Sequence, residues 1–71
     1  MWIVYSEVPD GDSYNRWYYA RYKTQERANK TAHGLNFVFK GKADGYFCVA
    51  DDSNPIIETI HGMHNVEDFN D

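Results

Sequence analysis

The stretch TQERANKTAHGL, residues 24–35, decides the fold because it carries the clearest helix signal in the chain. Thr24 is a residue type that caps helix N-termini, and Glu26 in the first turn suits the helix dipole. Gly34 stands where a glycine commonly ends a helix. An apolar stripe recurs at i, i+4 and i+7 and consists of Ala28, Ala32 and Leu35. The pattern predicts a helix over 24–34 that lies close against a sheet, because most of its stripe is alanine.

The segments on either side of this helix predict strands. Residues 2–8 are apolar on both faces, which indicates a central strand, and a connection over 9–15 leads to a second strand. Gly45 is typical of a hairpin turn, placed at 42–45. The expected strands after the first are 16–22, one starting at 37–39, 46–50 and a short edge strand at 56–60. We therefore expect an α+β fold with one helix packed on a curled antiparallel sheet of four to five strands, in the order β-β-α-β-β-(β).

Length and composition limit the kinds of protein that the chain can be. Its 71 residues predict a single domain, 1–71, with a loosely ordered acidic tail from about residue 66. The single cysteine, Cys48, excludes an intrachain disulfide framework. No apolar run approaches the length of a membrane helix, and the first residues carry no basic region typical of a signal peptide. We expect a cytoplasmic protein that does not contact membranes, and the host cytoplasm if a phage encodes it.

The net charge of −4 is unevenly distributed. Residues 1–15 carry three acids and no base, residues 16–42 carry all seven lysines and arginines against one acid, and residues 43–71 carry seven acids. Three interpretations are open. The blocks pair with each other, a basic face meets an acidic partner, or an acidic face meets a basic partner or imitates nucleic acid.

A search for catalytic or metal-binding motifs finds little. His61 and His64 are spaced as a metal pair could be, but no cysteine or carboxylate completes a site. Cys48 lies in a strand pattern between Phe47 and Val49, so we interpret it as a buried structural residue that resists thiol reagents. No glycine-rich phosphate loop is present. From the sequence we therefore expect that the chain is not an enzyme and that it binds no metal and no cofactor.

Rings crowd the predicted strand 16–22. If Tyr18, Ala20 and Tyr22 face the helix, then Trp17, Tyr19 and Arg21 share the opposite face, or the arrangement is the reverse. Trp, Tyr and Arg are enriched at the centres of protein interfaces, and exposed rings also stack on single-stranded bases. We predict a partner-binding surface made of Trp17, Tyr19, Arg21, Arg16 and Lys23. The alternative is that the outer rings pack on the C-terminal segment or on a second copy, giving a homodimer.

The run from Tyr22 to Asn36 resembles the strand-to-helix segment of small bacteriophage proteins, in which an aromatic-x-Thr/Ser entry leads into an E-x-A-x-x-x-A-x-x-L-N helix. The resemblance covers about a third of the chain. DNA-binding integrase arm domains, a sheet with one helix behind it, are also partly similar. Small acidic phage proteins of this size often bind and inhibit a host enzyme or defence complex, and this is what the resemblance implies here.

Two functions follow as expectations. The first is a small non-catalytic protein-binding module, a phage-type inhibitor or modulator of a host protein. The second is a small nucleic-acid-binding domain that uses the basic, aromatic block 16–42, since a local basic patch attracts phosphates even on an acidic protein.

Overall fold

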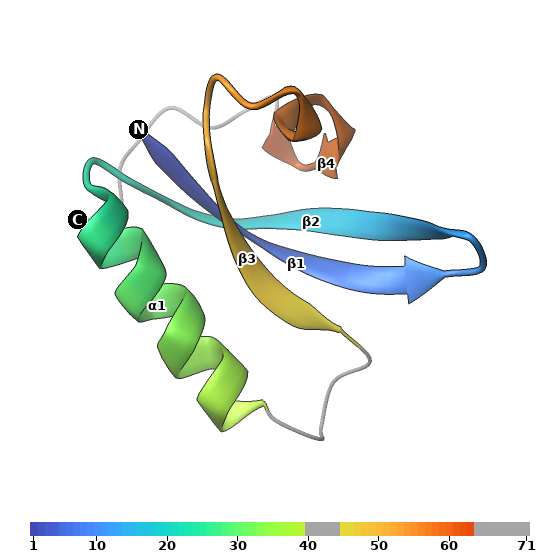
Figure 1. Ribbon diagram of the computed structural model, residues 1–71, viewed down its shortest axis with the longest axis horizontal. Helices are drawn as coiled ribbons and strands as arrows, with labels where there is room; N and C mark the ends of the chain where they lie inside the picture. Colours follow the sequence, from blue (N-terminus) through green and yellow to red (C-terminus); the bar gives the residue numbers. More distant parts are fainter. Residues whose placement is uncertain (40–44, 64–71) are drawn as a thin grey trace.

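The computed structural model describes residues 1–39 and 45–63. A central sheet has the strand order β3-β1-β2-β4, in which β1 pairs antiparallel with both β2 and β3 (Figure 1). The elements are β1 (Trp2–Asp10), β2 (Ser13–Tyr22), α1 (Gln25–Val38), β3 (Tyr46–Asp51), the 3-10 helix η1 (Pro55–Thr59) and β4 (Ile60–His61). The predicted α+β class is confirmed. The sheet is mixed rather than antiparallel, because β4 runs parallel to β2.

The hairpin of β1 and β2 is longer and tighter than predicted. Asp10 pairs with Ser13, so only Gly11 and Asp12 form the turn, and the expected long connection over 9–15 is wrong. Gly11 has a φ of 64°, a left-handed conformation that lets a two-residue loop match the twist of the two strands. As a result the turn end of the hairpin reaches beyond α1 (Figure 1).

The helix begins as the sequence predicts but ends later. Thr24 is the N-cap, and its side chain accepts a hydrogen bond from the backbone N–H of Arg27 at 3.3 Å. The helix continues through Gly34 to Val38, since Gly34 does not take the positive φ that would end it. The predicted strand at 37–39 is therefore wrong. The strand predicted at 46–50 does form, but it pairs with β1 instead of forming a hairpin with residues 37–39. Most of the turn predicted at 42–45 lies outside the described residues.

Two apolar clusters form, one on each face of the sheet. On the helix face, Val4 and Ala20 pack with the predicted alanines Ala28 and Ala32, and Leu35 joins them. On the opposite face, Ile3, Tyr5, Ala50 and Ile60 are buried under side chains that include those of η1. The helix stripe and the central position of β1 are thus confirmed.

The predicted edge strand at 56–60 is wrong for most of its length. Asn54 caps η1 by accepting a hydrogen bond from the N–H of Ile56 at 3.0 Å, and Pro55 follows at the first position. These two residues favour a helical turn, so the β-branched Ile56 and Ile57 are packed from a 3-10 helix. The acidic tail predicted from about residue 66 lies outside the described residues.

Candidate interaction surface

A β-bulge in β2 decides which side chains share a face. Val4 pairs with Ala20 and the next residue, Tyr5, pairs with Tyr18, so Tyr19 has no opposite residue on β1. Such an extra residue reverses the alternation of side chains along the rest of the strand. Trp17 therefore lies on the helix face of the sheet, the same face as Ala20.

Four rings gather on the helix face, where the hairpin extends past the buried alanines of α1. The Tyr19 and Phe47 ring centroids are 5.5 Å apart at an angle of 78°, and those of Phe39 and Phe47 are 6.1 Å apart. Trp17 is 53% exposed and Tyr19 is 51% exposed. We call this set the aromatic strip: Trp17, Tyr19, Phe39 and Phe47.

A small residue separates two of these rings. Ser6 pairs with Phe47 on one side and with Trp17 on the other, so the three side chains form one row across β3, β1 and β2. His61 continues the row on β4, and its ring centroid lies 4.6 Å from that of Trp17. The row alternates large, small and large side chains across the three strands.

The predicted grouping of Trp17, Tyr19 and Arg21 on one face is wrong. Arg21 pairs with Ile3 and so lies on the opposite face of the sheet from Trp17. The bulge at Tyr19 is the physical reason, because strict alternation would have placed the three side chains together.

The other predicted basic residues do not join the strip either. Arg16 lies on the opposite face, where its Nε donates to Glu7 Oε2 at 2.8 Å and its Nη1 donates to Thr59 Oγ1 at 3.3 Å. Lys23 is exposed just after the end of β2. The aromatic strip itself therefore contains no charged residue.

The partners of Glu7 form a polar cluster that the sequence reasoning missed. Glu7 is buried, and Tyr46 donates its hydroxyl to Glu7 Oε1 at 3.3 Å. The carboxylate, by its charge first and by this hydrogen bond second, raises the pKa of Tyr46. Glu7 and Arg16 are each three residues from the strand ends at the turn, so a correctly placed two-residue turn would have predicted the ion pair.

Cys48 is part of the same opposite face. It pairs with Tyr5 and is half-buried beside the second apolar cluster. Burial, and then the negative charge of Glu7, raises the pKa of the Cys48 thiol. The thiol is thus half-buried rather than fully buried as predicted, and a raised pKa makes a thiol a weaker nucleophile at neutral pH.

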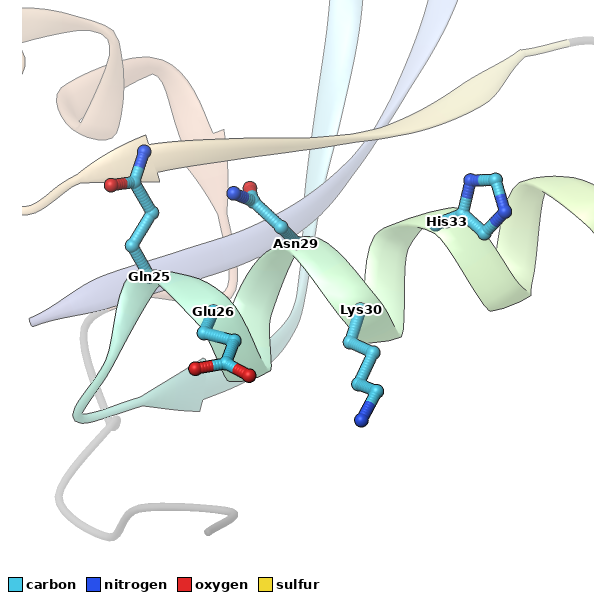
Figure 2. Close-up of a pocket in the computed structure, with 5 residues that line it drawn as sticks. All are labelled: Gln25, Glu26, Asn29, Lys30 and His33. Carbon is cyan, nitrogen blue, oxygen red and sulfur yellow. The ribbon is translucent and has the colours of Figure 1, made fainter.

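An open groove of about 540 Å³ runs along the exposed side of α1. Figure 2 shows Gln25, Asn29 and His33 extending from one side of the helix, and Glu26 and Lys30 from the other. Its lining is Gln25, Glu26, Asn29, Lys30 and His33. These are exposed polar side chains on successive helical turns, and they form no arrangement of nucleophile and base.

Residues 1–39 and 45–63 contain neither a metal-binding cluster nor a membrane-spanning helix. There, no three His, Cys, Asp or Glu side chains come close enough together to hold a metal ion. His64, the second member of the predicted histidine pair, lies outside that part of the chain. No helix of the same part is long and apolar enough to span a membrane. Comparisons with protein-family models, with curated proteins and with solved structures find no match to this chain.

Proposed function

We propose that the chain is a small non-catalytic protein-binding module that acts through the aromatic strip. The observation that carries the proposal is the exposure of Trp17 and Tyr19 beside Phe47 on one face of the sheet. Large rings presented by a rigid strand contribute contact area at a low cost in conformational entropy. Contiguous exposed apolar groups on a small domain are typical of a contact surface.

Among the residues that the structure describes, the placement of the arginines favours a protein partner over nucleic acid. A surface that follows a phosphate backbone needs lysine or arginine beside its stacking rings. Here Arg16 is held by Glu7 on the other face, and Arg21 also lies there. The resemblance to phage proteins supports a host protein as the partner, so that the chain would inhibit or modulate a host enzyme or defence complex in the host cytoplasm.

Site-specific crosslinking tests this function. A photoreactive residue replaces Tyr19 in the strip, or Tyr14, which is also exposed but lies on the opposite face. Each protein is irradiated in host lysate with and without nuclease. We expect one nuclease-resistant protein to be crosslinked from position 19 and not from position 14. Equal crosslinking from both positions, or loss of the product after nuclease treatment, would contradict the proposal.

The captured protein is then purified and its binding is measured directly. Trp17→Ala should accelerate dissociation at least about tenfold, because interface tryptophans commonly contribute 2 kcal/mol or more. Tyr14→Ala is the matched control and should change the dissociation rate less than about twofold. Far-UV circular dichroism must show that both variants are folded. If Trp17→Ala binds as the unchanged chain does, the strip is not the contact surface.

A further inference from the structure

We propose that the free chain forms a weak symmetric homodimer in which the aromatic strip of one copy packs against the aromatic strip of a second copy. This inference goes beyond the proposed function, because it concerns the chain before a partner binds. Both contacts use the strip, so the homodimer and the partner complex exclude each other. Two features support the homodimer: the apolar area that the strip leaves exposed, and the charges on either side of it.

The strip continues into exposed apolar side chains at the end of α1. Phe37 is 78% exposed and Val38 is 59% exposed, and both lie in the last turn of the helix next to Phe39. With about half of the Trp17 and Tyr19 rings added, this surface measures roughly 500 Å² per copy, since one aromatic side chain has roughly 150–250 Å². Two copies packed face to face would bury roughly 1,000 Å² in total, which is the lower limit for a specific interface and predicts a weak dimer.

The chemistry of the strip is complementary to itself. Each chain has a net charge of −4, but the strip has no charged residue, so two copies meet there without like charges at the contact. Within one copy, the rings of Tyr19 and Phe47 already pack edge to face. Rings from two copies can pack in the same way across a two-fold axis, because aromatic side chains prefer tilted or offset contacts.

The charges beside the strip decide how the two copies are oriented. The turn end of the β1–β2 hairpin carries Asp10 and Asp12 and extends past α1 (Figure 1). The exposed surface of α1 carries Arg27 and Lys30 against one acid, Glu26. If the two hairpins ran in the same direction, their acidic turns would meet. When they run in opposite directions, each acidic turn lies toward the helix of the other copy, so charge complementarity favours this orientation.

Analytical ultracentrifugation of the full chain tests the dimer. We expect the weight-average mass to rise from that of one chain toward that of two between about 10 µM and about 1 mM, as a small interface predicts. Trp17→Ala should raise the dimer Kd at least about a hundredfold, because a two-fold interface loses each contact twice. Tyr14→Ala, on the opposite face, is the matched control and should change the Kd less than about twofold. Far-UV circular dichroism must show that both variants are folded.

Neutralising single acids tests the orientation. Asp12→Asn should raise the dimer Kd roughly threefold, because the turn loses its attraction to the basic side chains of the other helix. Glu58→Gln removes the same charge from an exposed residue of η1, which packs on the opposite face. This control should leave the Kd unchanged or lower it slightly, since it only reduces the net repulsion between the copies. A Kd that does not rise for Asp12→Asn would reject the opposite orientation of the hairpins.

The homodimer is overturned if the folded chain stays monomeric over this concentration range, if Trp17→Ala dimerises as the unchanged chain does, or if species larger than a dimer accumulate. The variant with a photoreactive residue at position 19 gives a second measurement. Irradiated as the purified protein, it should yield a covalent product of two chains, which differs in mass from a conjugate with a host protein. A monomeric chain that still captures a host protein from position 19 would reject only the homodimer. A homodimer that captures no host protein would reject only the proposed function.

Discussion

Gly34 and Gly45 differ in whether the surrounding structure leaves room for a side chain at that position. Gly34 lies inside α1, where a Cβ atom would meet nothing within 4 Å. Gly45 lies just before β3, where a Cβ atom would collide with the backbone carbonyl of Glu7 and would approach Val8 Cα at 3.0 Å. Close backbone contact, rather than turn geometry, therefore requires glycine at position 45.

We predict that Gly34→Ala stabilises the chain and Gly45→Ala destabilises it. The first change should raise the free energy of unfolding by roughly 0.5–1 kcal/mol, because alanine loses less backbone entropy in a helix. The second should lower it by roughly 1–3 kcal/mol, because β1 or β3 must shift. Urea denaturation of both variants measures the difference. An equal effect at the two positions would show that β3 does not approach β1 as described.

The alanine stripe gives a second prediction at single residues. Ala32 is buried between α1 and the sheet. Ala32→Leu should therefore overpack that layer and lower the free energy of unfolding by roughly 1–3 kcal/mol. Lys30→Leu makes a similar change at an exposed position of the same helix and should have little effect. Thermal melting compares the two. An unchanged melting curve for Ala32→Leu would mean that the stripe faces solvent.

At the scale of elements, the side chain of Asn36 joins α1 to β3 through two hydrogen bonds with the backbone of Phe47. Asn36 Oδ1 accepts from the backbone N–H of Phe47 at 2.6 Å, and Asn36 Nδ2 donates to the Phe47 carbonyl at 3.0 Å. This pair satisfies both backbone groups of Phe47 at an edge of the sheet, where unpaired groups invite association with other chains. It also holds Phe47, a member of the aromatic strip, beside the last turns of the helix.

Asn36→Ala should therefore lower the free energy of unfolding by about 1–3 kcal/mol, because two backbone groups lose their partners. Asn29→Ala is the matched control, since Asn29 is exposed on the same helix and should gain slightly from the higher helix propensity of alanine. Chemical denaturation measures both variants. Equal stability of the two would show that the Asn36 bonds contribute nothing.

The elements also show what the sequence could predict. Thr24, Ala28 and Ala32 identify the start and buried face of the helix because capping and periodicity are local. Its end was mispredicted because Gly34 fits either a cap or a helix interior, and contacts with β3 decide between them. The face of Trp17 depends on the bulge at Tyr19, which no local pattern reveals. Trp17 and Tyr19 could be identified as candidate residues from their residue types. That Arg21 lies on the other face of the sheet could not be predicted.

At the scale of the whole molecule, the sheet is packed against α1 on one face and against η1 on the other. On the helix face, buried alanines let α1 lie close to β1 and β2; on the other face, tyrosines and isoleucines pack with a buried carboxylate. The opposite face thus contains the cluster of Tyr5, Glu7, Arg16 and Cys48, while the aromatic strip lies on the helix face beyond the part that α1 covers. The proposed binding surface and the titratable cluster around Glu7 consequently lie on different faces of one sheet, while both faces contribute buried apolar residues to stability.

This separation predicts that alkaline pH weakens the fold through the opposite face. Burial, followed by the charges of Cys48 and Glu7, raises the pKa of Tyr5 from 10.0 to about 12. The folded state retains this proton while the unfolded state loses it, so the stability from Tyr5 is fully present below pH 10 and is lost as pH rises to about 12. Urea midpoints between pH 8 and pH 12 should fall more steeply for the unchanged chain than for Tyr5→Phe. Ile3→Val, which removes a buried methyl group without a titratable one, should lower the midpoints by a similar amount at each pH. Parallel pH curves for Tyr5→Phe and the unchanged chain would show that the Tyr5 hydroxyl is not the responsible group.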